Sequence, residues 1–148
     1  MKYFRKIEGE RVYLSPINKD DVNIYTKWMN DSSVTDGICQ TTKVFSIDAE
    51  KEYLEKIGVN DYQFAIVEKS SDTLMGNCSI FSIDSICGHG ELGIFIGEES
   101  FRSKGYGKEV IRLLLSFCFE TLNFASVELS AISFNERAVN CYKSAGFK

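Results

Sequence analysis

Apolar residues recur along this chain with two different periods, which together predict a single mixed α/β domain. Five short segments are rich in apolar and β-branched residues and are bounded by turn residues, a pattern typical of strands. The predicted strands are Arg11–Ile17, Tyr62–Glu68, Leu74–Ile83, Gly90–Ile96 and Ser126–Ile132. Gly76, inside the third of them, indicates a bulge or a close backbone approach.

Other segments follow the helical period. Asn18 caps a helix whose apolar face is formed by Val22, Tyr25, Trp28 and Met29. Further helices are predicted at Ile47–Ile57, Gly105–Leu122 and Asn135–Ala145, the last stopped by Gly146. On the longest one, the predicted buried stripe is Ile111, Leu114, Leu115, Cys118 and Leu122, with Lys108, Glu109, Arg112 and Glu120 in solvent. Residues 32–46 are predicted to be a loop.

Composition narrows the function classes. The chain has 148 residues, a net charge of −4 and 44% hydrophobic residues, as expected for one globular domain without a basic field for nucleic acid. Five scattered cysteines without a Cys-x-x-Cys pair indicate reduced thiols in a cytoplasmic protein. One histidine and the cysteine spacing argue against a metal site. The first residues lack the apolar core of a signal peptide, and no run of about 18 apolar residues predicts a membrane span.

The most informative segment lies between the fourth predicted strand and the longest helix. It reads Phe-Arg-Ser-Lys-Gly-Tyr-Gly-Lys, with Arg102, Gly105 and Gly107 in an Arg-x-x-Gly-x-Gly pattern. Glycines let the backbone turn sharply and approach a ligand closely, and the following helix start offers free N–H groups and the positive end of its dipole. Strand, glycine loop and helix in that order predict an anion-binding site, most naturally for phosphate.

Two common phosphate loops do not match these residues. A Walker loop requires Gly-Lys-Ser/Thr, but Lys108 is followed by Glu109, and Arg102 stands where the first glycine is needed. A dinucleotide fingerprint requires a third glycine where this chain has Val110. A nucleotide-binding protein is therefore the least favoured function.

The loop resembles the coenzyme A-binding loop of the GCN5-related N-acetyltransferases, the GNAT family. A second motif of that family follows 33 residues after Arg102: Asn135-x-x-Ala138-x-x-x-Tyr142-x-x-x-Gly146-Phe147. The start of the chain (Arg11–Ile17, Asp20-Asp21 and Trp28–Asp31) and the segment Gly90–Ile96 resemble the RimJ/RimL-like branch, which acetylates protein N-termini, polyamines and small amines. The resemblance covers nearly the whole chain. It implies a mixed, mostly antiparallel central sheet flanked by helices.

The resemblance also implies roles for individual residues. Acetyl-CoA would be the acetyl donor, and no metal would take part. The implied cofactor-binding residues are Phe95, Ile96, Arg102, Ser103, Lys104, Gly105, Tyr106, Gly107, Lys108 and Asn135. Among them, Phe95 and Ile96 would act through main-chain groups, and Arg102, Lys104 and Lys108 would neutralise phosphate charge.

Transfer of an acetyl group to an amine requires removal of a proton from the ammonium and protonation of the departing thiolate. Tyr142 is the candidate general acid, carried over from the family motif. Glu91 is the candidate general base, directly or through water, and His89 is a second candidate. Strand alternation places both on the same face as Phe95. The acceptor remains open: residues 28–45 would form one wall of its site.

The chain also departs from the family pattern, because it ends directly after Gly146-Phe147, where the family usually continues with two more strands. We therefore expect residues 1–148 to be one domain that is truncated at its C-terminus, and we expect self-association, such as a homodimer, through the incomplete sheet. Two functions stay under consideration: an acetyl-CoA-dependent N-acetyltransferase, and a non-catalytic acyl-CoA-binding module.

Overall fold

One twisted sheet organises the molecule. The computed structural model describes residues 2–36, 42–130 and 136–147. Within these ranges the sheet has six strands in sequence order: Ile7–Glu8 (β1), Val12–Pro16 (β2), Tyr62–Glu68 (β3), Thr73–Asp84 (β4), His89–Ile96 (β5) and Ser126–Leu129 (β6). Neighbouring strands are antiparallel except β5 and β6, which are parallel. This confirms the mixed, mostly antiparallel sheet that the family resemblance implies.

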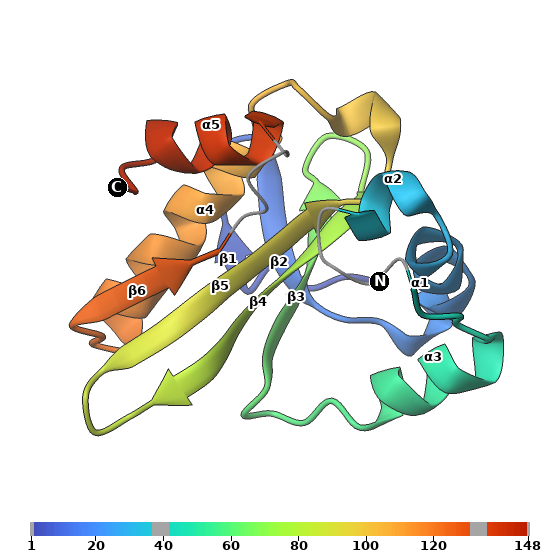
Figure 1. Ribbon diagram of the computed structural model, residues 1–148, viewed down its shortest axis with the longest axis horizontal. Helices are drawn as coiled ribbons and strands as arrows, with labels where there is room; N and C mark the ends of the chain where they lie inside the picture. The colour runs from blue at the N-terminus through green and yellow to red at the C-terminus, as the bar shows by residue number, and fades with distance from the viewer. Residues whose placement is uncertain (1, 37–41, 131–135, 148) are drawn as a thin grey trace.

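Helices cover both faces of the sheet (Figure 1). Val22–Met29 (α1), Ser32–Thr35 (α2) and Ile47–Glu55 (α3) lie on one face, and Tyr106–Ser116 (α4) and Glu136–Ser144 (α5) lie on the other. Because α4 connects the parallel strands β5 and β6, it crosses the sheet and packs beside β2 and β5. The start of α4 is thereby placed at the end of β5.

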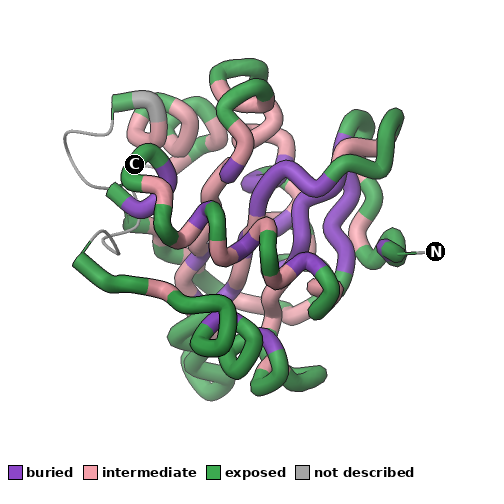
Figure 2. The backbone as a smooth tube through the Cα atoms, turned by 90° about the vertical axis from the view of Figure 1, so that its right-hand side faces the viewer, coloured by how far each residue is buried: buried purple, intermediate pink, exposed green. Residues whose placement is uncertain are grey.

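The alternation of side chains along the strands produces a separate core on each face. Val12, Leu14 and Ile66 point toward α4, whereas Tyr13 and Val67 point toward α1 and α3. All five are at most 2% exposed. Figure 2 shows that the buried backbone is concentrated in the central strands. Burial on both faces makes the central strands a rigid frame for the groups at their ends.

The predicted element boundaries agree closely with the structure in the central strands. Strand β3 has the predicted limits, and the register of β3 against β4 shifts beside Gly76, as predicted. A Cβ at Gly76 would overlap the carbonyl oxygen of Phe95, so glycine is needed for the close backbone approach.

Three elements differ from the prediction. The loop over 32–46 was wrong in part, because Asp31 caps the four-residue helix α2 through the N–H of Ser33. The long helix over 105–122 is interrupted, because Phe117–Thr121 form a π-helical turn. The two-residue strand β1 was not predicted, since two residues carry no readable periodicity. The predicted ends at Ile132 and Asn135 lie outside the described residues.

Candidate active site

The loop before α4 adopts the conformation that an anion-binding helix start requires. Gly105 is the N-terminal cap of α4 and has a φ of 84°, in the left-handed region that favours glycine. Among the described residues, no side chain caps this helix. The N–H groups of its first turn therefore point out of the helix without an intrahelical acceptor, at the positive end of the helix dipole.

These N–H groups face a cavity of about 500 Å³, here called the loop cavity. Most of the residues predicted to bind the cofactor line it: Phe95, Ile96, Arg102, Ser103, Gly105, Tyr106, Gly107 and Lys108. Ala138, Cys141 and Tyr142 of α5 form the opposite wall. The loop, the end of β5 and α5 are thus brought together around one space. Lys104 is exposed and is not part of this lining, and Asn135 lies outside the described residues.

The guanidinium of Arg102 is occupied by the protein itself. Its Nε donates to the carbonyl oxygen of Ile96 at 3.0 Å, and its Nη2 donates to that of Gly97 at 3.3 Å. Its Nη1 donates to Ser33 Oγ at 3.3 Å. Arg102 therefore fixes the chain where β5 leaves the sheet, in addition to lining the loop cavity.

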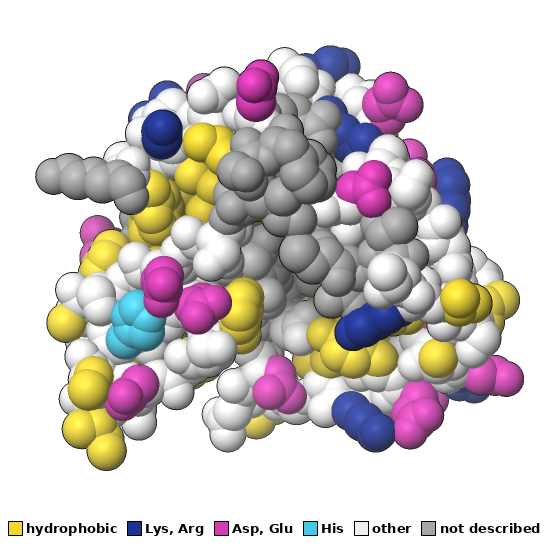
Figure 3. Space-filling view, in the orientation of Figure 1, with side chains coloured by type: hydrophobic (Ala, Val, Ile, Leu, Met, Phe, Trp, Pro, Cys, Tyr) yellow, Lys and Arg dark blue, Asp and Glu magenta, His cyan; other side chains and the backbone are white. Residues whose placement is uncertain are grey.

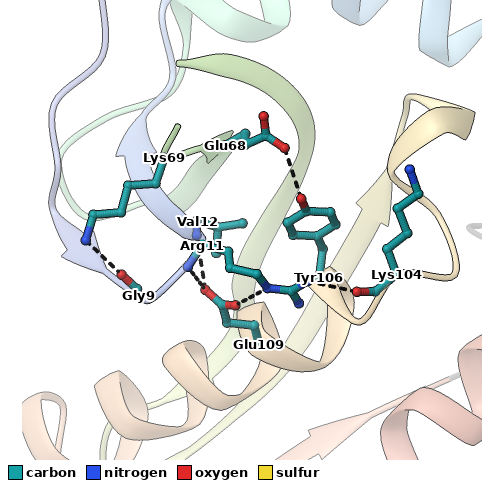
Figure 4. A network of polar contacts seen from close by, with 8 residues as sticks. All are labelled: Gly9, Arg11, Val12, Glu68, Lys69, Lys104, Tyr106 and Glu109. Atoms are coloured by element: carbon teal, nitrogen blue, oxygen red, sulfur yellow. Dashed lines mark hydrogen bonds and ion pairs between the residues drawn. The ribbon is translucent and has the colours of Figure 1, made fainter. Parts of the chain in front are cut away.

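A polar network behind the loop holds it against the sheet (Figure 4). Arg11 lies over the ring of Tyr106, 4.3 Å from its centroid, and donates from Nη1 to the carbonyl oxygen of Lys104 at 2.9 Å. The hydroxyl of Tyr106 donates to Glu68 Oε2 at 3.0 Å. The hydroxyl of Tyr106 is therefore directed toward β3, while the residue also lines the loop cavity.

Glu109 completes this network, and the prediction that it is exposed was wrong. Its side chain is 17% exposed, and Oε2 accepts hydrogen bonds from the backbone N–H groups of Arg11 and Val12 at 2.9 and 3.1 Å. Burial opposes ionisation of Glu109, but the hydrogen bonds from Arg11 and Val12 outweigh it, and its pKa is lowered. Arg11 and Glu109 are 98 residues apart, so a helical pattern alone could not reveal the pair.

Strands β5 and β6 separate at the site. Their pairing runs from His89↔Ser126 to Leu92↔Leu129, whereas β5 continues to Ile96 alongside β4 (Figure 1). Within the described residues, the β6-facing edge of Gly93–Ile96 is therefore left without a strand partner. This edge presents backbone donors and acceptors to the space between the loop and α5.

Tyr142 lies where the loop cavity meets a second one. A cavity of about 720 Å³, here called the sheet cavity, opens on the face that carries α1 and α3. Ile94, Phe95 and Tyr142 line both cavities. Burial raises the pKa of Tyr142 to about 12, and its phenol has no hydrogen-bond partner within the described chain. Tyr142 is thus a protonated donor at neutral pH, located between the two spaces.

The two candidate bases lie further along β5. Glu91 is half-buried, pairs in register with Phe81 and Glu128, and lines neither cavity. His89 contacts Ser126 Oγ at 2.8 Å and Glu128 Oε2 at 3.3 Å. Figure 3 shows this histidine beside acidic side chains, to one side of the hollow in this face. The structure therefore does not bring Glu91 or His89 next to Tyr142.

A carboxyl group that the sequence did not single out lies inside the sheet cavity. Glu50 of α3 is only 5% exposed, and burial raises its pKa. Its position at the start of a predicted helix is ordinary for glutamate, so only the packing of α3 in the folded chain reveals it. Of the predicted acceptor wall over 28–45, Met29, Lys43 and Phe45 line the same cavity.

The described residues contain no group of three His, Cys, Asp or Glu side chains arranged to hold a metal ion. No helix among them is both long enough and apolar enough to cross a bilayer.

A glycine loop at an open helix start thus lies beside two strands that separate. The family model described as an acetyltransferase (GNAT) domain matches residues 11–148, and the chain belongs to this family. A relative is the uncharacterized, prophage-derived N-acetyltransferase YokL of Bacillus subtilis, 26% identical over 94% of this chain and 77% of its own length. An N-acetyltransferase 9-like protein of Caenorhabditis briggsae is 24% identical over 97% of this chain and 77% of its own length.

Solved structures support the fold. An acetyltransferase of the GNAT family from Bacillus anthracis superposes with a TM-score of 0.83 at 17% identity, over 96% of this chain and 82% of its own. Spermidine N-acetyltransferase from Vibrio cholerae, solved with CoA and spermine, gives 0.83 at 22% identity, over 93% and 81%. The chain is thus an acetyltransferase of the GNAT family by sequence and by fold.

Proposed function

We propose that this protein transfers the acetyl group of acetyl-CoA to a primary amine by direct attack in a ternary complex. The observation that carries the proposal is the meeting of the loop cavity and the sheet cavity at Ile94, Phe95 and Tyr142. A donor in one cavity and an acceptor in the other would meet at these residues. Proximity of two bound reactants removes much of the entropic barrier to their reaction.

The residues of the loop cavity fit the donor. The open N–H groups of the first turn of α4, together with Lys108, would hold its pyrophosphate, as helix starts hold anions elsewhere. The free edge of β5 at Phe95 and Ile96 would bind the pantetheine arm through the backbone. Acetyl-CoA supplies an activated thioester. Arg102, which donates to the carbonyl groups of Ile96 and Gly97, would hold the loop and the end of β5 in fixed positions relative to each other.

Proton transfer is assigned to two groups. Tyr142 would donate its proton to the departing thiolate, because its raised pKa keeps it protonated across the physiological range. Glu91 would take the proton of the ammonium through water, since its side chain lies outside both cavities. His89 is the second candidate for this role.

The class of acceptor is a further part of this proposal. We place the protein in the RimJ/RimL-like branch on its N-terminal motifs, so protein N-termini, polyamines and other small amines are the acceptors to test. A panel of such amines, assayed by thiol release from acetyl-CoA, tests the function directly. Turnover of at least one amine is expected; calorimetry showing no acetyl-CoA binding would refute the proposal.

One observation favours a second candidate function, a non-catalytic acyl-CoA-binding module. Neither Glu91 nor His89 lines a cavity with Tyr142, so a base in direct contact with the acceptor is not among the predicted residues. The same panel separates the two functions, because binding of acetyl-CoA without turnover of any amine supports the module.

We also propose that the protein self-associates. The hairpin between β4 and β5 exposes Phe81, Ile83 and Ile86 at 45, 38 and 96%. Apolar side chains grouped in this way favour association. Light scattering is expected to give a mass above that of one chain, and a monomeric mass at micromolar concentration would contradict this.

A further inference from the structure

Glu50 is a buried acid whose side chain has no partner among the described residues. Its side chain lines the sheet cavity from α3, and the residue is 5% exposed. Within the described residues it forms no side-chain hydrogen bond and no ion pair. Lys43 lines the same cavity but is exposed and does not pair with it. A carboxylate that is largely removed from bulk water and has no partner among the described residues is unfavourable, so the contacts of these residues do not explain its position.

The surrounding groups do not supply that reason. The helix start is capped by Ser46, whose Oγ accepts the N–H of Ala49, so Glu50 is not needed as a cap. Tyr25 donates to Asn77 at 3.2 Å, and Tyr53 accepts from Gln63 at 2.6 Å. These four polar neighbours thus bond to one another and not to Glu50, whose side chain lines the cavity.

We infer that Glu50 determines acceptor specificity by binding a positively charged group of the acceptor other than the amine that reacts. This rests on the proposed function. The reacting amine must be neutral when it attacks, whereas a carboxylate holds an amine in its charged form. Glu50 therefore suits the second charge of a diamine or polyamine, with the reacting end at Tyr142.

The shape and lining of the sheet cavity agree with such an acceptor. Its volume of about 720 Å³ exceeds the need of a single small amine. Apolar side chains, including Ile94, Phe95 and Leu54, line it together with Glu50 and Tyr142. Methylene groups between two amines would contact this apolar lining while the charges sit at the ends.

The test compares pairs of amines that differ by one charge. Putrescine and n-butylamine have the same carbon chain, and spermidine extends the series. Binding to the CoA-loaded protein is measured by calorimetry, and turnover by thiol release. We expect wild type to prefer putrescine or spermidine over n-butylamine, and Glu50→Gln to weaken polyamine binding about 10- to 100-fold while leaving n-butylamine unchanged.

Two further variants make the result specific. Glu55→Gln removes the same charge from an exposed position of the same helix, outside the cavity, and should leave every constant unchanged. Glu50→Asp keeps the charge and should restore part of the preference for polyamines. Glu50→Gln should melt at or above the wild-type temperature, because it removes a buried charge without a partner; a purely structural acid would instead lower it.

The outcomes separate this inference from the proposed function. Turnover of monoamines and polyamines alike, unaffected by Glu50→Gln, overturns the role of Glu50 and leaves the acetyltransferase intact. Polyamine binding that depends on Glu50, without turnover of any amine, refutes the enzyme and with it the role of Glu50 in acceptor choice, and leaves Glu50 as a polyamine-binding residue only. Failure of putrescine and spermidine to bind the CoA-loaded protein overturns the inference.

Discussion

At the scale of single residues, Tyr142 is the side chain on which the proposed chemistry most depends. It is the polar side chain that faces both cavities, and burial raises its pKa to about 12. We expect Tyr142→Phe to lower kcat by a factor of about 100, the lower end for loss of a positioned acid, with little change in acetyl-CoA affinity. Steady-state kinetics and calorimetry measure the two quantities separately.

The pH profile provides a control for this prediction. Because the raised pKa keeps Tyr142 protonated, the wild-type rate should rise as the amine loses its proton and should not fall again below about pH 10. A descending limb between pH 7 and 9 would show that the acid is a group with a lower pKa. Tyr142→Phe should keep the wild-type melting temperature within a few degrees.

Arg102 is a motif residue whose side chain binds backbone carbonyl groups of its own chain. Its three guanidinium nitrogens bind the carbonyl oxygens of Ile96 and Gly97 and the hydroxyl of Ser33. Lysine keeps the charge but not the fork of donors. Arg102→Lys should therefore weaken acetyl-CoA binding about 10-fold and also lower the melting temperature, as expected if one or two net hydrogen bonds are lost.

The matched control for this variant is Lys104→Ala, which removes an exposed charge from the same loop. If Arg102 acts only as a charge for phosphate, Arg102→Lys will retain wild-type affinity and stability. Loss of affinity in both variants, with stability unchanged, would likewise favour direct phosphate binding over positioning.

At the scale of elements, α4 is bound to the sheet by polar contacts as well as by its apolar stripe. Glu109 accepts from the backbone N–H groups of Arg11 and Val12 at the start of β2, and from Arg11 Nε at 3.1 Å. Glu109→Ala leaves these donors without their acceptor, and we expect it to cost about 1–3 kcal/mol in the free energy of unfolding. Urea denaturation at neutral pH measures this.

The sign of the pH effect follows from the lowered pKa of Glu109. The folded state holds the ionised form more strongly than the unfolded chain does, so the contribution is present above the unfolded pKa and is lost as pH falls through the folded pKa. The difference between wild type and Glu109→Ala should therefore shrink below about pH 4. Glu120→Ala, exposed near the end of the same helical segment, is the control and should change little.

An element could be predicted from the sequence where the residues that determine it are close together in the chain. Strand β3 was predicted with its limits because its apolar run is bounded by turn residues on both sides. The π-helical turn at Phe117–Thr121 was missed because its sequence continues the helical period. At the site, the glycine loop could be read from the sequence, whereas the burial of Glu50 and the partners of Glu109 depend on contacts between distant segments.

At the scale of the whole molecule, the segment that follows β5 is held from both faces of the sheet. The end of β5 is tied to the loop through Arg102, and on the other face Trp28 packs against Gly97, where a Cβ would overlap its ring. Trp28 also donates to Glu98 Oε1 at 3.0 Å. Helix α1, which lines the sheet cavity, and the loop before α4, which lines the loop cavity, therefore both contact the segment Gly97-Glu98. This shared contact fixes the positions of the two cavities relative to each other.

The same packing predicts how the stability of the protein changes at high pH. Burial and a hydrogen bond to Asp72 raise the pKa of Tyr13 to about 12, and burial raises that of Tyr142 to about 12. Tyr3 is shifted in the same direction by burial and by its hydrogen bond to Asp21. The unfolded chain releases these protons near pH 10, and the folded state retains them. Stability should therefore be unaffected by these groups below about pH 10 and should fall as pH rises toward 12.

Urea midpoints measured from pH 8 to pH 12 test this prediction, with Tyr13→Phe as the informative variant. Phenylalanine preserves the ring in the core but carries no titratable hydroxyl, so the variant should be less stable than wild type at pH 8 and should lose less stability above pH 10. Tyr53→Phe, on a half-exposed ring of α3, loses the hydrogen bond from Gln63 and serves as the control, because its stability should change with pH as that of wild type does. A wild-type midpoint that stays constant through pH 12 would mean that the buried phenols titrate at the same pH in both states. The packing that separates the two faces of the sheet would then contribute nothing to their ionisation.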